Sequence, residues 1–238
     1  MIHLLFFILG CCTGSFINVI FSRNDWYKGR SHCDSCGYIL KWYDLIPVIS
    51  FVVLGGKCRK CKTKIDCSHL FSELMMGATM LVSSLCFVKF GIGYGITVIV
   101  ALFCMAVAAI EDYKEQMVYS IILNGGIIVT MLTKCGYYVY LGEYSSALDV
   151  IAFVSVLKLV MKVGSIVFKD KLGSGDWDIF LIIFVLGEAQ GLILSVTFAS
   201  VFGCLIYFPQ IILKKRGPKD PFPFIPLLLM GTLGYLMI

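Results

Sequence analysis

Long apolar runs separated by short polar connections dominate the chain. A run of roughly 20 apolar residues is long enough to cross a bilayer as a helix. The run at 178–187 is shorter, but residues 187–191, which follow it, have the composition of a turn between two helices. The pattern predicts eight membrane-spanning helices, near residues 2–21, 70–89, 96–111, 118–140, 148–168, 178–187, 192–213 and 222–238.

The composition of the chain agrees with this pattern. Of its 238 residues, 59% are hydrophobic, and the mean hydropathy is +0.90. Soluble domains are about half apolar. We therefore predict an all-α, polytopic membrane protein of about eight transmembrane helices. The first run lacks a basic leader segment and an Ala-x-Ala-like cleavage site, so we interpret it as a retained helix and not as a signal peptide.

Positive charge is concentrated between the apolar runs. Lys and Arg are enriched in cytoplasmic loops of membrane proteins, so the net charge of +5 indicates orientation in the membrane and no nucleic-acid partner. Segment 22–69 holds nine Lys and Arg residues, and we expect it in the cytoplasm. With eight crossings, Asp112 and Asp176 then share the cytoplasmic face. Charged side chains at membrane depth are costly and usually mark function.

Four of the eleven cysteines form a pattern in the longest polar segment. Each Cys-x-x-Cys turn presents two thiolates, and two such turns complete a tetrahedral zinc site. A closed shell of four thiolates leaves no open position for chemistry, so this zinc would be structural. Two redox dithiols or free cysteines are the alternatives. The predicted ligands are Cys33, Cys36, Cys58 and Cys61.

The two aspartates are the candidates for catalysis. Asp176 closes the sequence Gly-Ser-Gly-Asp at 173–176, where the glycines permit close backbone approach as a helix begins. Read alone, this is a Gly-rich loop with a capping aspartate. Asp112 lies between Glu111 and Glu115, and spacing does not decide which of these three acids is catalytic. Two close carboxylates share one proton, so one activates water while the other donates a hydrogen bond.

Other hydrolytic motifs do not occur in the sequence. The three histidines are not near a nucleophile motif, and His-Glu-x-x-His is absent. Lys158 and Lys162 lie one turn apart within the run 148–168. Each needs an acid partner or must extend its ammonium group to the membrane interface.

Several stretches together resemble one family, the type IV prepilin peptidases of the Gly-x-Gly-Asp aspartyl class. Residues 14–20, the Cys-x-x-Cys pairs, residues 42–50 and Glu73 follow in the order of that family. Asp112 matches the aspartate of its Ile-Asp-x-(Arg/Lys)-x-x-x-Ile-Pro stretch, and Asp176 matches that of Gly-x-Gly-Asp. The chain departs from the family pattern at four positions: Asp34 and Tyr119 replace prolines, Ser120 replaces Asn or Asp, and Asp178 replaces a frequent lysine.

The resemblance implies an endopeptidase of the bacterial cytoplasmic (inner) membrane. Its substrates would be prepilins or pseudopilins, cut after a glycine at the end of a short basic leader on the cytoplasmic face. For many members it also implies N-methylation of the new amino terminus with S-adenosylmethionine, although the chain has no Gly-rich nucleotide-binding motif. We expect three parts: a first transmembrane helix (1–21), a cytoplasmic zinc-binding loop (22–69) and a transmembrane peptidase domain (70–238), in contact with membrane lipid.

Two functions from other classes also fit the residues. A non-catalytic membrane scaffold would dock a partner through the zinc ribbon and would tolerate asparagine at positions 112 and 176. A thiol oxidoreductase would use the two Cys-x-x-Cys pairs, and bound zinc would exclude it because the metal occupies the thiolates.

Overall fold

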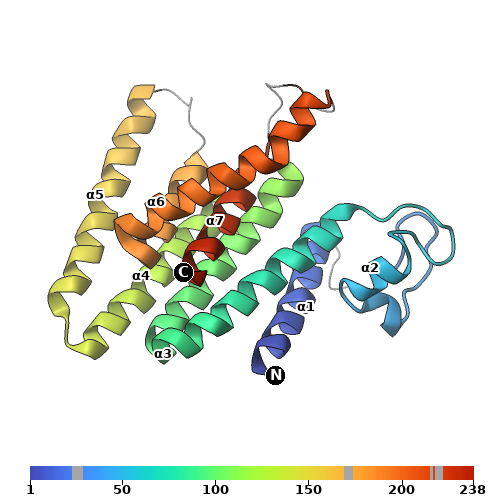
Figure 1. The fold of residues 1–238 in the computed structure, drawn as a ribbon, viewed down its shortest axis with the longest axis horizontal. Helices are drawn as coiled ribbons and strands as arrows, with labels where there is room; N and C mark the ends of the chain where they lie inside the picture. Colours follow the sequence, from blue (N-terminus) through green and yellow to red (C-terminus); the bar gives the residue numbers. More distant parts are fainter. Residues whose placement is uncertain (23–28, 169–173, 215–216, 218–221) are drawn as a thin grey trace. The chain divides into compact units, whose positions relative to one another are not determined.

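The computed structural model describes residues 1–22, 29–168, 174–214, 217 and 222–238. Residues 23–28 of the predicted loop 22–69 and Gly173 of the Gly-Ser-Gly-Asp sequence lie outside these ranges. Within them the chain is helical, and its β pairing is limited to two isolated bridges, which confirms the all-α prediction. The elements are α1 (Ile2–Ser22), η1 (Trp42–Leu45), α2 (Ile49–Val53), α3 (Cys67–Glu115), α4 (Ser120–Leu141), α5 (Tyr144–Phe168), α6 (Ser174–Ile212) and α7 (Ile225–Met237) (Figure 1).

Two long helices are interrupted where the sequence predicts breaks. In α3, Gly91 has φ 81°, a left-handed conformation that glycine adopts without strain. In α6, non-helical torsions at Gly187 and Glu188 separate the helix into two parts. The predicted runs 70–89 and 96–111 therefore correspond to the two parts of α3. The runs 178–187 and 192–213 correspond to the two parts of α6.

Four helices of the described residues are long and apolar enough to cross a membrane: Ile2–Ser22, Cys67–Glu115, Ser120–Leu141 and Gly175–Ile212. Two of these contain the breaks described above. Each of the eight predicted runs has a helical counterpart, but crossing of the membrane by all eight stays a prediction. The chain divides into two compact units, Met1–Leu81 and Val82–Ile238, whose boundary lies within α3.

In the first unit, α1 packs closely against the beginning of α3. A side chain at Gly14 would place its Cβ 2.4 Å from the carbonyl oxygen of Ser72, and one at Gly10 would be 2.4 Å from that of Met76. Small residues at such positions allow two helix backbones to approach each other. The buried amide of Asn18 donates a hydrogen bond of 3.1 Å to the hydroxyl of Ser72. This contact adds a polar link to the apolar interface.

In the second unit, α6 packs against α7, α4 and α5. The ring of Phe153 on α5 stacks on that of Phe184 on α6, with centroids 3.8 Å apart. Fully buried side chains of α3 and α6, such as Leu102, Met105, Ile179 and Ile182, form the core. The packing brings the beginnings of α4 and α7 into contact with the end of α3: the N–H of Tyr119 donates to Glu111, and the N–H of Ile225 donates to Asp112.

Candidate active site and metal centre

The four cysteines predicted to bind zinc lie together. Their sulfur atoms are all within 4.8 Å of one another. The sulfurs of Cys33 and Cys61 are 3.8 Å apart, and those of Cys36 and Cys58 are 4.0 Å apart. Tetrahedral zinc with Zn–S bonds of about 2.3 Å separates its sulfurs by about 3.8 Å. The cluster therefore has the size and the donor set of a zinc site, and no other group in the described ranges does.

Two short backbone turns present the thiols. The N–H of Gly37 donates to the carbonyl of Cys33 at 2.9 Å, and the N–H of Lys62 donates to the carbonyl of Cys58 at 3.1 Å. Gly37 and Lys62 both have positive φ, 64° and 59°. Each Cys-x-x-Cys sequence is thus a tight turn with its two sulfurs on one side, which is the local conformation that the spacing predicts.

Hydrogen bonds favour the thiolate form in part of the cluster. The hydroxyl of Thr63, 3.1 Å from the sulfur of Cys61, lowers the pKa of Cys61 to about 6 with the help of a backbone N–H. The backbone N–H of Cys36 lowers the pKa of Cys33. The N–H of Tyr38 acts in the same direction on Cys36, but desolvation and the neighbouring thiols outweigh it and raise the pKa of Cys36 to about 11. Thiolates are the metal-binding form, so the cluster is prepared for a cation.

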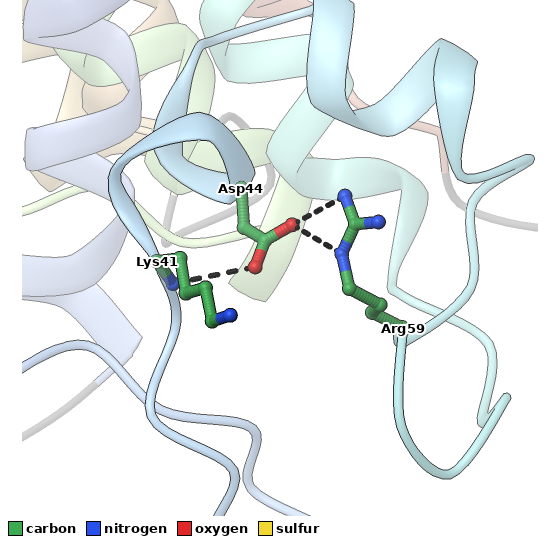
Figure 2. Close-up of polar contacts among 3 residues, drawn as sticks. All are labelled: Lys41, Asp44 and Arg59. Atoms are coloured by element: carbon green, nitrogen blue, oxygen red, sulfur yellow. Dashed lines mark hydrogen bonds and ion pairs between the residues drawn. The ribbon is translucent and has the colours of Figure 1, made fainter.

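An ion pair joins the second cysteine turn to η1. The carboxylate of Asp44, whose side chain is 1% exposed, accepts hydrogen bonds of 2.8 Å from Arg59 and 3.3 Å from the backbone N–H of Lys41 (Figure 2). The guanidinium of Arg59 also lies 4.9 Å from the ring centroid of Tyr43. Sequence reasoning did not find this pair, because Asp44 and Arg59 are separated by 15 positions and follow no metal or helix spacing.

A pocket of about 360 Å³ lies in the first unit, between α1, the cysteine loop and α3. At its wall the buried carboxylate of Glu73 accepts a 2.7 Å hydrogen bond from the backbone N–H of Val48. This bond attaches the loop to α3. The polar side chains that line the pocket include Ser15, His32, Asp44, Asp66, His69 and Glu73. Its volume is in the range of small-molecule sites.

The two aspartates predicted as catalytic come from helices far apart in the sequence. Asp112 lies in the last turn of α3, and Asp176 lies in the first turn of α6. One carboxylate oxygen of Asp112 accepts a 3.0 Å hydrogen bond from the N–H of Ile225, the first residue of α7. The carboxylates of Asp112 and Asp176 are close enough for their charges to interact. Both are half-buried, a position in which two negative charges repel each other more strongly than in water.

The neighbouring acids point elsewhere. Glu111 is 3% exposed, and one of its oxygens accepts a 3.3 Å hydrogen bond from the N–H of Tyr119, the residue before α4. The other oxygen has no partner among the described residues. Glu115 is exposed. Among the three acids that spacing left open, the interaction with Asp176 therefore favours Asp112.

Lys158 has polar partners within the second unit. Its ammonium group donates to the amide oxygen of Asn124 on α4, and its charge attracts the carboxylate of Asp178 on α6. The sequence shows that this lysine needs a partner but does not show which one. The pairing depends on the packing of three helices.

Fold and site together define a class: helical proteins with membrane-spanning apolar helices, a Cys₄ loop and two interacting aspartates at helix ends. Comparison with known proteins then indicates the family. A model of the bacterial peptidase A24 N-terminal domain matches residues 8–88. The prepilin leader peptidase/N-methyltransferase of Myxococcus xanthus is 37% identical over 92 residues, which cover 37% of this chain and 27% of that protein.

Two relatives match over most of the chain. The type 4 prepilin-like proteins leader peptide-processing enzyme of Escherichia coli is 26% identical and covers 86% of this chain, with 74% of its own length matched. The prepilin leader peptidase/N-methyltransferase of Bacillus subtilis is also 26% identical, over 97% of this chain and 92% of its own. No solved structure matches the chain. The predicted resemblance to the prepilin peptidases is confirmed.

Proposed function

We propose that this protein is a membrane endopeptidase that removes the short basic leader from type IV prepilin-like proteins after a glycine. The main observation in favour is the interaction between Asp112 and Asp176 at the positions where the family carries its catalytic aspartates. The similarity to enzymes named for prepilin leader processing over most of the chain gives the substrate class.

In the proposed reaction the two aspartates share one proton. The ionised carboxylate removes a proton from a water molecule as that water attacks the scissile carbonyl carbon. The protonated carboxylic acid donates a hydrogen bond to the carbonyl oxygen. Proton transfer to the leaving nitrogen then breaks the C–N bond and releases the new amino terminus. Backbone hydrogen bonds from Ile225 and Phe224 hold the carboxylate of Asp112 at the beginning of α7.

The proposed site faces the cytoplasm from the bacterial inner membrane. A prepilin carries its basic leader on the cytoplasmic side and its apolar helix in the bilayer, so the bond to be cut lies at that interface. Segment 22–69, rich in Lys and Arg, supports the same orientation for the ends of α3 and α6. Water is available at this depth, and the reaction requires no channel through the bilayer.

The Cys₄ cluster would hold zinc as a structural ion. Four thiolates close the coordination shell, so the ion would fold the loop and take no part in hydrolysis. S-adenosylmethionine, if bound, supplies a methyl group for the new amino terminus. We propose that it would bind in the pocket of the first unit, where the carboxylates of Asp66 and Glu73 belong to the lining.

The test is incubation of the purified full-length protein with a prepilin-like substrate, followed by sequencing of the product's amino terminus. We expect cleavage after the glycine that ends the leader. Addition of methyl-labelled S-adenosylmethionine reveals N-methylation in the same product. An intact substrate, with zinc bound to the protein, would instead favour the scaffold function, and thiol exchange without zinc would favour the oxidoreductase.

A further inference from the structure

A short connection, from Gln116 to Tyr119, joins α3 to α4. Backbone N–H groups attach both of its ends to the end of α3. The N–H of Gln116 donates to the carbonyl of Asp112 at 3.0 Å, and Gln116 has a left-handed φ of 54°, with which the chain leaves the helix. The N–H of Tyr119 donates to the carboxylate of Glu111 at 3.3 Å. The path of the connection is therefore set by a proposed catalytic residue and by the residue that precedes it.

The same connection contacts the first turn of α6. A Cβ atom added at Gly175 would lie 3.8 Å from the Cβ of Val118 and 3.6 Å from the Cδ1 of Leu123, which is ordinary van der Waals contact. Val118 belongs to the connection, and Leu123 is a buried residue in the first turn of α4. Gly175 directly precedes Asp176. The connection thus contacts both the helix end that carries Asp112 and the helix beginning that carries Asp176.

Glu111 is a costly residue at this place in the apolar core. It is 3% exposed, and its second oxygen has no hydrogen-bond partner among the described residues. A buried carboxyl group with incomplete hydrogen bonding costs free energy, so an apolar side chain would suit the packing of α3 better. Within the described part of the chain, the interaction that an apolar side chain could not replace is acceptance of the N–H of Tyr119.

Tyr119 stands where the family pattern has proline, and its backbone suits either residue. Its φ of −69° lies in the narrow range that the proline ring imposes. Proline has no N–H, whereas the N–H of Tyr119 needs an acceptor, which Glu111 supplies. Tyrosine is free to rotate about φ. The hydrogen bond to Glu111 therefore supplies a restraint that a proline ring would supply by itself.

We propose that Glu111 is a positioning residue for leader cleavage. By accepting the N–H of Tyr119 it holds the connection in place, and Val118 then keeps the first turn of α6, which carries Asp176, at the end of α3. The carboxyl group of Glu111 acts as a hydrogen-bond acceptor and takes no part in the proton transfers. This inference rests on the proposed catalytic function of the two aspartates.

The test separates the acceptor from the acid in the purified full-length protein. Glu111→Gln keeps an oxygen that accepts the N–H of Tyr119, and it retains most of kcat for cleavage of a prepilin-like substrate. Glu111→Met has a similar length but no acceptor. It lowers kcat by about ten- to a hundredfold with little change in KM, because misplacement of a catalytic group by about 1 Å has effects of this size. Adding Tyr119→Pro to Glu111→Met removes the unpaired N–H and restrains φ, so the double variant recovers part of kcat.

A second pair of variants tests the contact with α6 and leaves Glu111 intact. Val118→Gly removes the Cβ that lies beside Gly175, and it lowers kcat. Met117→Gly is the matched control, because it adds the same backbone freedom at a neighbouring side chain that is 71% exposed. This control retains most of kcat.

Melting temperatures are measured for every variant, and the two glycine variants provide the test if Glu111→Met does not fold. A folded Glu111→Met variant with unchanged kcat overturns the inference, as does a double variant no more active than Glu111→Met, or an equal kcat for Val118→Gly and Met117→Gly. Loss of cleavage in Glu111→Gln also overturns it, because the acid would then act in the chemistry. Asp176→Asn is assayed beside them. If it remains active, the proposed function fails; if it is inactive while Glu111→Met is fully active, only the positioning role fails.

Discussion

Replacement of Gly14 by alanine tests the close packing of α1 against α3. The added Cβ would lie 2.4 Å from the carbonyl oxygen of Ser72, 2.9 Å from its carbonyl carbon and 3.0 Å from the Cα of Glu73. All three atoms belong to the backbone, so no side chain can move aside. The helices must separate by about 1 Å to restore ordinary contact, and overpacking of this kind costs about 1–3 kcal/mol.

The separation also affects the polar contact one turn further along α1. The 3.1 Å hydrogen bond between Asn18 and Ser72 would lengthen to about 4 Å, beyond hydrogen-bonding distance. Loss of this bond adds about 1 kcal/mol. Alanine is favoured over glycine in a helix by about 1 kcal/mol, which offsets part of this loss. The expected net destabilisation is therefore about 1–3 kcal/mol, measured as the loss of resistance to unfolding by a denaturing detergent in the purified protein.

Gly136→Ala is the matched control. Gly136 lies in α4 and has no atom within 4 Å of its Cβ position. The same added methyl group meets nothing there, and alanine is favoured over glycine in a helix by about 1 kcal/mol. This variant is expected to be as stable as the original chain or more stable. Equal stability of the Gly14 and Gly136 variants would refute the packing argument.

Three further predictions concern the cysteine loop. Elemental analysis of purified protein finds close to one zinc per chain, and serine in place of any of the four zinc-binding cysteines lowers the zinc content. A metal-free protein with a rigid loop would contradict the predicted zinc site. Protons compete with zinc for the four thiolates, so zinc is released as the pH falls; unchanged zinc content at pH 4 would count against this. Arg59→Met increases amide hydrogen exchange in the loop more than Asp44→Asn does. The Arg59 variant leaves the carboxylate of Asp44, whose side chain is 1% exposed, without its cation (Figure 2). A larger increase in the Asp44 variant than in the Arg59 variant would argue against the ion pair.

The features that the sequence predicts correctly are those whose signal is local. The spacing of Cys33 and Cys36, repeated at Cys58 and Cys61, makes each turn a two-thiol unit whatever surrounds it. A left-handed glycine likewise interrupts a helix through its own backbone freedom, as at Gly91. These elements need no knowledge of tertiary packing.

The features that sequence reasoning missed depend on which helices become neighbours. The capping of α7 by Asp112 joins residues 113 positions apart, and no spacing rule connects them. Lys158 requires a polar partner, and Asn124 becomes one only because α4 packs against α5. Spacing also left Glu111, Asp112 and Glu115 open as candidates, and the different hydrogen-bond partners of Glu111 and Asp112, at the beginnings of α4 and α7, depend on helix packing that spacing does not encode.

Leader cleavage by aspartate-to-asparagine variants is the most direct test of the central claim, that Asp112 and Asp176 together activate water. Asparagine has nearly the size of aspartate but cannot exchange the proton. In a purified assay with a prepilin-like substrate, Asp112→Asn and Asp176→Asn should each form no product with the new amino terminus, while Glu111→Gln, whose side chain faces Tyr119, should still cleave. Full cleavage by either asparagine variant would contradict the account.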